Sequence, residues 1–132
     1  MNRDNIVEWV LRLVPAVIML QTLFYKFTGH PDSVLLFTQL GVESFGRIGL
    51  GIVELFAAIL LLIPETVKYG IVLGSGLMAG AIATHVFIIG INFNNDGGAL
   101  FTLAAVAMIC LLVLAYRHQP EIKRLIPGFK VA

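Results

Sequence analysis

Four long apolar segments decide what this chain can fold into. Their approximate bounds are 6–25, 45–63, 67–91 and 99–116. A helix of about 20 apolar residues crosses the roughly 30 Å hydrocarbon core of a bilayer, because an α-helix rises about 1.5 Å per residue. The sequence therefore predicts an all-α integral membrane protein with the lipid bilayer as its main partner. We expect a single domain over residues 1–132, a transmembrane four-helix bundle.

The alternative fold is a soluble helical bundle, and the amino-acid composition argues against it. Of the 132 residues, 58% are hydrophobic and only 13% are charged, whereas a soluble domain carries about 25% charged residues. Helices at a water-exposed surface also show a polar stripe, and the second, third and fourth segments show almost none. Both observations favour a membrane protein.

Charge and cysteine usage argue against two functional classes. The net charge is +1 and the basic residues are scattered or terminal, unlike the clustered basic face of a nucleic-acid-binding protein. We predict no nucleic-acid partner. Cys110 is the single cysteine, so this chain alone has neither an internal disulfide nor a Cys-x-x-Cys pair for thiol exchange.

The basic residues also predict the orientation in the membrane. With four crossings, the N- and C-termini lie on the same face. That face would carry Arg3, Arg12, Lys68, Arg117, Lys123, Arg124 and Lys130, and the other only Lys26 and Arg47. Basic residues collect on the cytoplasmic side, so both termini are predicted to be cytoplasmic. We expect residues 117–132 to form a basic tail.

The connection between the first and second segments contains its own helix signals. Gly29-His30-Pro31-Asp32-Ser33 is a start signal, the apolar run Val34-Leu35-Leu36-Phe37 follows, and Gly41 is a stop signal. A helix of about two turns is too short to span the bilayer. We therefore expect a short interfacial helix near residues 34–40, placed as a lid over the outer mouth of the bundle.

Polar residues from three segments are expected to meet near the outer face. The helical rise places Glu54 roughly 13 Å below the outer end of the second segment, His85 roughly 9 Å below that of the third, and Gln21 roughly 6 Å below that of the first. Lys26 closes the first segment, and Arg47 lies near the mouth of the second.

These depths predict a binding pocket. An ionisable side chain inside a membrane segment costs several kcal/mol unless it is paired or hydrated, so Glu54 and His85 should face partners inside the bundle. Gln21, Lys26, Arg47, Glu54 and His85 are the candidate ligand-binding residues. The alternative is that Glu54 and a basic partner form only a structural clasp.

The sequence contains no motif that binds an electron-carrying cofactor. The sequence has no pair of histidines placed to bind haem, no cysteine cluster and no nucleotide-binding glycine motif. His30 and Asp32 are too sparse for a metal site, and we predict no metal. Any redox chemistry would therefore need a partner protein.

Two stretches resemble the DoxX family of small four-span membrane proteins. They are Phe24-Tyr25-Lys26-Phe27-Thr28-Gly29 at the end of the first segment and Gly49-Leu50-Gly51-Ile52-Val53-Glu54-Leu55 in the second. The resemblance covers roughly residues 13–91. In this chain Gln21-Thr22 replaces the small residues that many relatives carry before the lysine. The resemblance implies a bacterial cytoplasmic membrane and a redox-linked role, since the family is named after a subunit associated with thiosulfate:quinone oxidoreductase.

Three functions stay open at this stage, and whether the chain is an enzyme is one of the open points. In the leading interpretation the pocket binds a quinone headgroup, with Glu54 and His85 handling protons and Lys26 or Arg47 holding an oxygen. The second is an accessory protein that packs on another membrane or redox protein through its third segment, whose small-residue pairs are Gly70, Gly74, Gly76 and Gly80. The third is a small transporter or ion-conducting homo-oligomer lined by Glu54.

Overall fold

The computed structural model describes residues 2–128 of the chain, and within them all regular structure is helical. Lys130 of the predicted basic tail lies outside the described residues. The α-helices are α1 (Arg3–Thr28), α2 (Pro31–Gln39), α3 (Phe45–Leu62), α4 (Val67–Thr84), α5 (Ala99–Arg117) and α6 (Gln119–Leu125). A π-helical turn, η2 (His85–Ile89), extends α4, and 3-10 turns occur at η1 (Pro64–Thr66) and η3 (Phe93–Asn95).

Four of these helical stretches are long and apolar enough to cross a membrane: α1, α3, α4 with its flanking turns, and α5. This confirms the predicted all-α class and the four apolar spans. Each span packs against two others, in the ring α1, α3, α4, α5. Large apolar side chains cover the outside, as lipid contact requires: Phe24, Phe45, Phe56, Phe87, Ile88 and Ile109.

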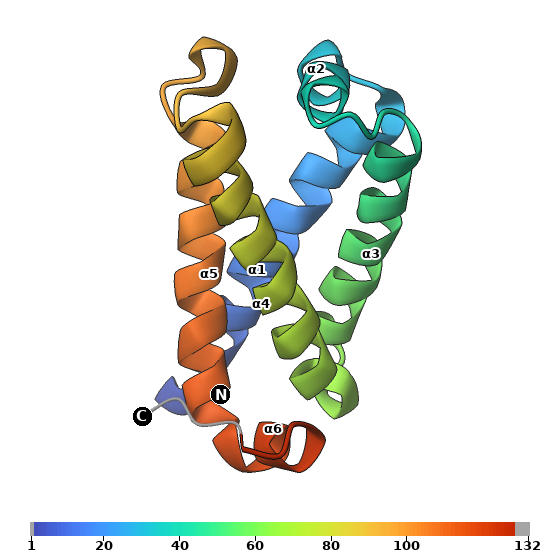
Figure 1. Ribbon diagram of the computed structural model, residues 1–132. Coiled ribbons are helices and arrows are strands. Elements are labelled where there is room, and N and C mark those ends of the chain that lie inside the picture. Colours follow the sequence, from blue (N-terminus) through green and yellow to red (C-terminus); the bar gives the residue numbers. More distant parts are fainter. Residues whose placement is uncertain (1, 129–132) are drawn as a thin grey trace.

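The two ends of the bundle differ. The first turn of α1 and helix α6 lie at one end, here called the terminal end, whereas α2 and the loop 90–98 lie at the other, here called the α2 end (Figure 1). The fully buried large side chains come mainly from the terminal half: Met19, Leu61, Ile71, Leu111, Leu114 and Ile122. The core is therefore densest at the terminal end.

The region predicted as a basic tail contains a further helix, α6. Pro120 occupies its first turn, where a missing backbone N–H costs nothing, and Ile122 is completely buried. Contacts of α6 with α4 and α5 close the terminal end of the bundle. No helix was predicted in this basic segment; α6 forms there and docks on the bundle through the buried Ile122.

The glycines of α4 differ in how closely their neighbours pack. A methyl group on Gly70 would lie 2.7 Å from the backbone nitrogen of Leu61, and one on Gly74 would lie 3.3 Å from the Leu111 side chain. These two glycines let α4 approach α3 and α5 closely, as small residues do in membrane bundles. Gly76 and Gly80 make no such contact, since nothing lies within 4 Å of a methyl group placed there.

Candidate functional site

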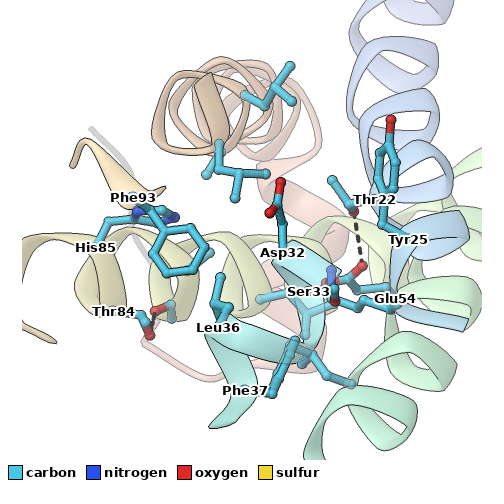
Figure 2. A pocket seen from close by; sticks show the side chains of 18 of the residues that line it. Thr22, Tyr25, Asp32, Ser33, Leu36, Phe37, Glu54, Thr84, His85 and Phe93 are labelled. Carbon is cyan, nitrogen blue, oxygen red and sulfur yellow. Dashed lines mark hydrogen bonds and ion pairs between the residues drawn. The ribbon is translucent and has the colours of Figure 1, made fainter. Parts of the chain in front are cut away.

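A cavity of about 620 Å³ lies toward the α2 end, with walls from α1, α2, α3, α4, η2 and α5. Its surface is mostly apolar, and Figure 2 shows polar side chains reaching it from several elements. A volume in this range suits a small-molecule site, which is typically apolar with a few placed polar groups. Gly76 and Gly80 are both in the wall, and nothing lies within 4 Å of a methyl group placed on either.

Lys26 and Glu54 form an ion pair in the cavity wall. Lys26 Nζ lies 3.2 Å from Glu54 Oε1, and the Thr22 hydroxyl lies 3.3 Å from Oε2 (Figure 2). The hydroxyl is also 3.0 Å from the Met19 carbonyl, so its one proton is shared between two acceptors. Glu54 is only 5% exposed. An ammonium has three protons, and Lys26 can therefore donate to a ligand oxygen while it stays paired with Glu54.

His85 reaches the same cavity from the π-helical turn. Its Nδ1 lies 3.1 Å from the Gly90 carbonyl oxygen. A carbonyl only accepts, so Nδ1 carries the proton, and Nε2 is left as an acceptor when the ring is neutral. The ring packs edge-on against Phe101, with centroids 6.0 Å apart.

Three of the five predicted pocket residues line the cavity and two do not. Lys26, Glu54 and His85 are in its wall. Gln21 lies on the exposed side of α1. Arg47 bonds Glu43 at 2.8 Å and donates to the backbone carbonyl of Lys26, so it ties the start of α3 to the end of α1 outside the cavity lining.

Thr22 and Tyr25 are polar residues of α1 that line the cavity and that the sequence analysis did not include in the site. Residues four apart share a helix face, whereas residues five apart do not. Thr22 is four residues before Lys26 and Gln21 is five before it. This spacing could have identified Thr22 as the residue that accompanies Lys26 into the cavity.

Helix α2 covers the cavity at the α2 end. It begins earlier than the predicted 34–40, because Pro31 occupies its first turn and the His30 ring accepts a hydrogen bond from the Asp32 backbone N–H at 3.2 Å. Leu36 and Phe37 face the cavity. Asp32 also accepts a hydrogen bond from the Asn94 side chain at 3.0 Å, which joins α2 to the loop before α5.

Comparisons of the chain with protein-family models, with curated proteins and with solved structures found no match. The resemblance to the DoxX family therefore stays a prediction. Within residues 2–128 there is also no group of three or more His, Cys, Asp or Glu side chains placed to hold a metal ion. What the site can do is argued below from its own geometry.

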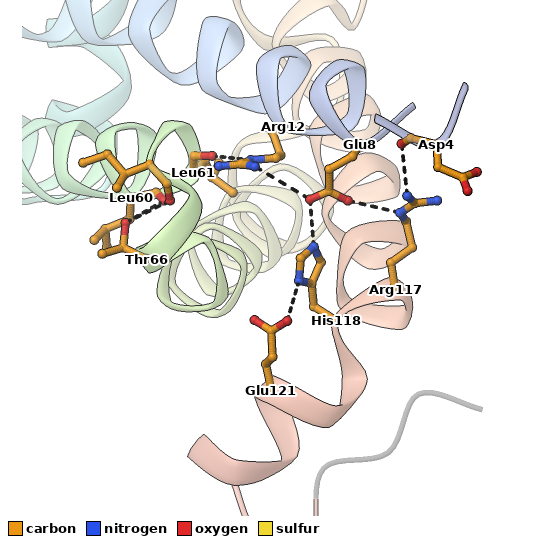
Figure 3. A network of polar contacts seen from close by, with 10 residues as sticks. Asp4, Glu8, Arg12, Leu60, Leu61, Thr66, Arg117, His118 and Glu121 are labelled. Carbon is orange, nitrogen blue, oxygen red and sulfur yellow. Dashed lines mark hydrogen bonds and ion pairs between the residues drawn. The ribbon is translucent and has the colours of Figure 1, made fainter. Parts of the chain in front are cut away.

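A second polar cluster lies at the terminal end and centres on Glu8. One Glu8 oxygen is 3.1 Å from Arg117 Nε, and the other is 2.8 Å from His118 Nε2 and 3.9 Å from Arg12 (Figure 3). Arg12 is 4% exposed and donates to the Leu61 carbonyl at 2.7 Å. That carbonyl lies in the last turn of α3, so no backbone N–H of the helix is available to bond to it. The cluster therefore fastens α1, α3 and α5 together.

We expect Glu8→Gln to lower the free energy of unfolding in detergent by about 1–3 kcal/mol, because hydrogen bonds to charged groups contribute about that much. Thermal melting followed by circular dichroism measures the change. Glu121→Gln is the matched control, since Glu121 is half exposed and, among the described residues, its carboxylate pairs with His118 alone, at 3.4 Å. Equal losses in both variants would contradict a central role for Glu8.

Proposed function

We propose that this integral membrane protein binds a lipophilic small molecule that carries a carbonyl or hydroxyl oxygen, with a quinone as the leading candidate. The observation that carries the proposal is the Lys26–Glu54 pair, 3.2 Å apart, in the wall of a mostly apolar cavity between membrane-crossing helices. Ionisable groups at membrane depth are expensive and usually functional. An ion pair used only as a clasp would not need a cavity of about 620 Å³ beside it.

The polar groups in the wall match the needs of such a ligand. Lys26 would donate a hydrogen bond to a carbonyl oxygen, and Glu54 would hold the ammonium in place. The neutral His85 ring would accept a hydrogen bond from a hydroxyl through Nε2. Oxidation of a bound hydroquinone to a quinone releases two electrons and two protons; in this proposal the Glu54 carboxylate and Nε2 of the neutral His85 ring accept the protons, and a redox partner protein takes the electrons.

The distribution of basic residues supports a cytoplasmic location for the terminal end. Described basic residues on the terminal side are Arg3, Arg12, Lys68, Arg117, Lys123 and Arg124, whereas the α2 end has Lys26 and Arg47. We place the protein in the cytoplasmic membrane of a bacterium, with both termini inside and the cavity toward the outer face.

The test is to purify the protein in a mild detergent and identify co-purifying small molecules by mass spectrometry. We expect a quinone with the wild-type protein and at least a roughly tenfold loss in Glu54→Gln, since about 1.4 kcal/mol of lost binding free energy has that effect. Glu43→Gln is the matched control, because Glu43 pairs with Arg47 outside the cavity lining.

Two other outcomes would reject the proposal. Equal retention of the quinone by both variants would mean that it binds elsewhere on the protein. A stoichiometric protein partner that co-purifies with every variant, without any small molecule, would support the accessory-protein function instead. Circular dichroism of each variant confirms that the helices are intact before the comparison is made.

A further inference from the structure

Arg47 joins the two chain segments that flank helix α2. Its guanidinium donates to the backbone carbonyl of Lys26, before α2, and lies 2.8 Å from the carboxylate of Glu43, after α2. A glycine with a left-handed backbone stands between each of these points and the helix: Gly29 has φ 70° and Gly41 has φ 77°. Glycine absorbs changes in φ and ψ at low steric cost. Helix α2 can therefore turn about these two glycines while Arg47 holds the segments outside them together.

Helix α2 and the loop 90–98 both form the wall of the cavity at the α2 end. Leu36 and Phe37 line the cavity from α2, and Phe93 and Asp96 line it from the loop (Figure 2). Phe37 is the buried side chain of α2, and Leu36 is only partly buried. A segment with few buried apolar side chains opens more readily than the core that it covers.

The loop is braced by its own hydrogen bonds, whereas α2 is not. The carboxylate of Asp96 accepts hydrogen bonds from the backbone N–H groups of Gly98 and Leu100, at 2.7 and 3.2 Å. Among the described residues, the side-chain hydrogen bond that crosses from this loop to α2 runs from the Asn94 amide to the Asp32 carboxylate, at 3.0 Å. Loss of that bond would therefore free α2 rather than the loop.

We propose that α2 is a hinged lid over the cavity, that it opens by turning about Gly29 and Gly41, and that the hydrogen bond between Asp32 and Asn94 is the latch that keeps it closed. The inference goes beyond the proposed function, because the movement does not depend on which molecule binds. Lys26 lies on the fixed side of the hinge, where Arg47 holds its carbonyl. The Lys26–Glu54 pair therefore keeps its place when the lid opens.

The test measures how fast a cysteine inside the cavity reacts with a reagent from water. Cys110 is replaced by alanine, and cysteine is introduced at Ala104, which lines the cavity and is 6% exposed. The protein is placed in lipid nanodiscs and treated with a small charged methanethiosulfonate. Asn94→Gly removes the latch, and Asn95→Gly is the matched control. Both asparagines are exposed in the same loop with positive φ, 51° and 61°, so glycine relieves similar backbone strain at each.

We expect Asn94→Gly to speed the labelling about three- to tenfold, the change in an opening equilibrium that loss of one hydrogen bond produces. Asn95→Gly should leave the rate within about twofold of wild type. Asp32→Ala should act like Asn94→Gly, and the double variant should be no faster than either, because residues that act through one bond are not additive. A cysteine at Thr38, exposed on α2 and outside the cavity lining, should react equally fast in every variant.

Three results would overturn the latch. An unchanged rate in Asn94→Gly would mean that the reagent reaches the cavity by another route. An equal rise in Asn95→Gly, or additive effects of Asp32→Ala and Asn94→Gly, would indicate general loosening of the α2 end. Because the labelling uses no ligand, failure of the latch leaves the proposed function standing, and absence of a bound quinone leaves the latch standing.

Discussion

Replacing Lys26 by methionine should destabilise the protein by about 3–5 kcal/mol, because it leaves the Glu54 carboxylate buried without its charge partner. Glu54 is 5% exposed, and its other contact is the shared proton of Thr22. The methionine keeps most of the length of the lysine stem, so the packing of α1 changes little. Unfolding in mixed micelles of a mild detergent and dodecyl sulfate measures the free energy.

The matched control is the double variant Lys26→Met with Glu54→Gln, which removes both charges. Replacing both members of a buried ion pair by neutral side chains of similar volume is often neutral or stabilising, so we expect the double variant to be at least as stable as wild type to within about 1 kcal/mol. Ligand binding should still be lost. This comparison separates the two interpretations of the pair: a stable double variant that keeps its ligand would indicate a structural clasp alone. A double variant as unstable as Lys26→Met would contradict the charge argument.

Gly70→Ala should cost about 1–3 kcal/mol, the usual range for overpacking a tightly packed site. The added methyl group would lie 2.7 Å from the nitrogen of Leu61 and 3.0 Å from the carbonyl carbon of Leu60. Both atoms belong to the backbone of α3, which cannot turn aside as a side chain can. The two helices must therefore move apart where the core is densest.

Gly76→Ala is the control for this substitution. It adds the same methyl group to the same helix, where nothing lies within 4 Å. The intrinsic preference of alanine over glycine for a helix applies to both variants and cancels in their comparison. Thermal melting in detergent should therefore show a loss for Gly70→Ala and almost none for Gly76→Ala. Similar melting temperatures would mean that α3 and α4 can adjust to the extra volume.

The sequence was enough to predict the four spans, because each is set by the thickness of the bilayer rather than by a particular neighbour. The predicted 45–63 and 99–116 agree with α3 (Phe45–Leu62) and α5 (Ala99–Arg117) to within one residue at each end. The π turn at His85–Ile89 could not be predicted, since it depends on how the end of α4 packs, as the contact of His85 with Phe101 shows.

The sequence predicted how deep the candidate site residues lie in the membrane, but not the direction in which each side chain points. The helical rise placed Glu54 and His85 in the outer half of their spans, with Lys26 at the outer end of the first span, and all three line one cavity. Depth alone could not separate Gln21 from Thr22, since these neighbours point about 100° apart around the helix. Arg47 had a nearer carboxylate at Glu43, 2.8 Å away, and a charge four residues away on the same helix is an easier partner than one on another span.

The tightly packed core lies at the terminal end of the bundle, whereas the cavity lies toward the α2 end. Residues that hold the helices together, such as Leu61, Gly70 and Leu111, are remote from those that would meet a ligand. Substitutions at partly buried cavity residues outside the core cluster, such as Leu36, should therefore cost less stability than substitutions at Leu61 or Leu111. A bundle built in this way can change the ligand that it binds while the packing of its core stays the same.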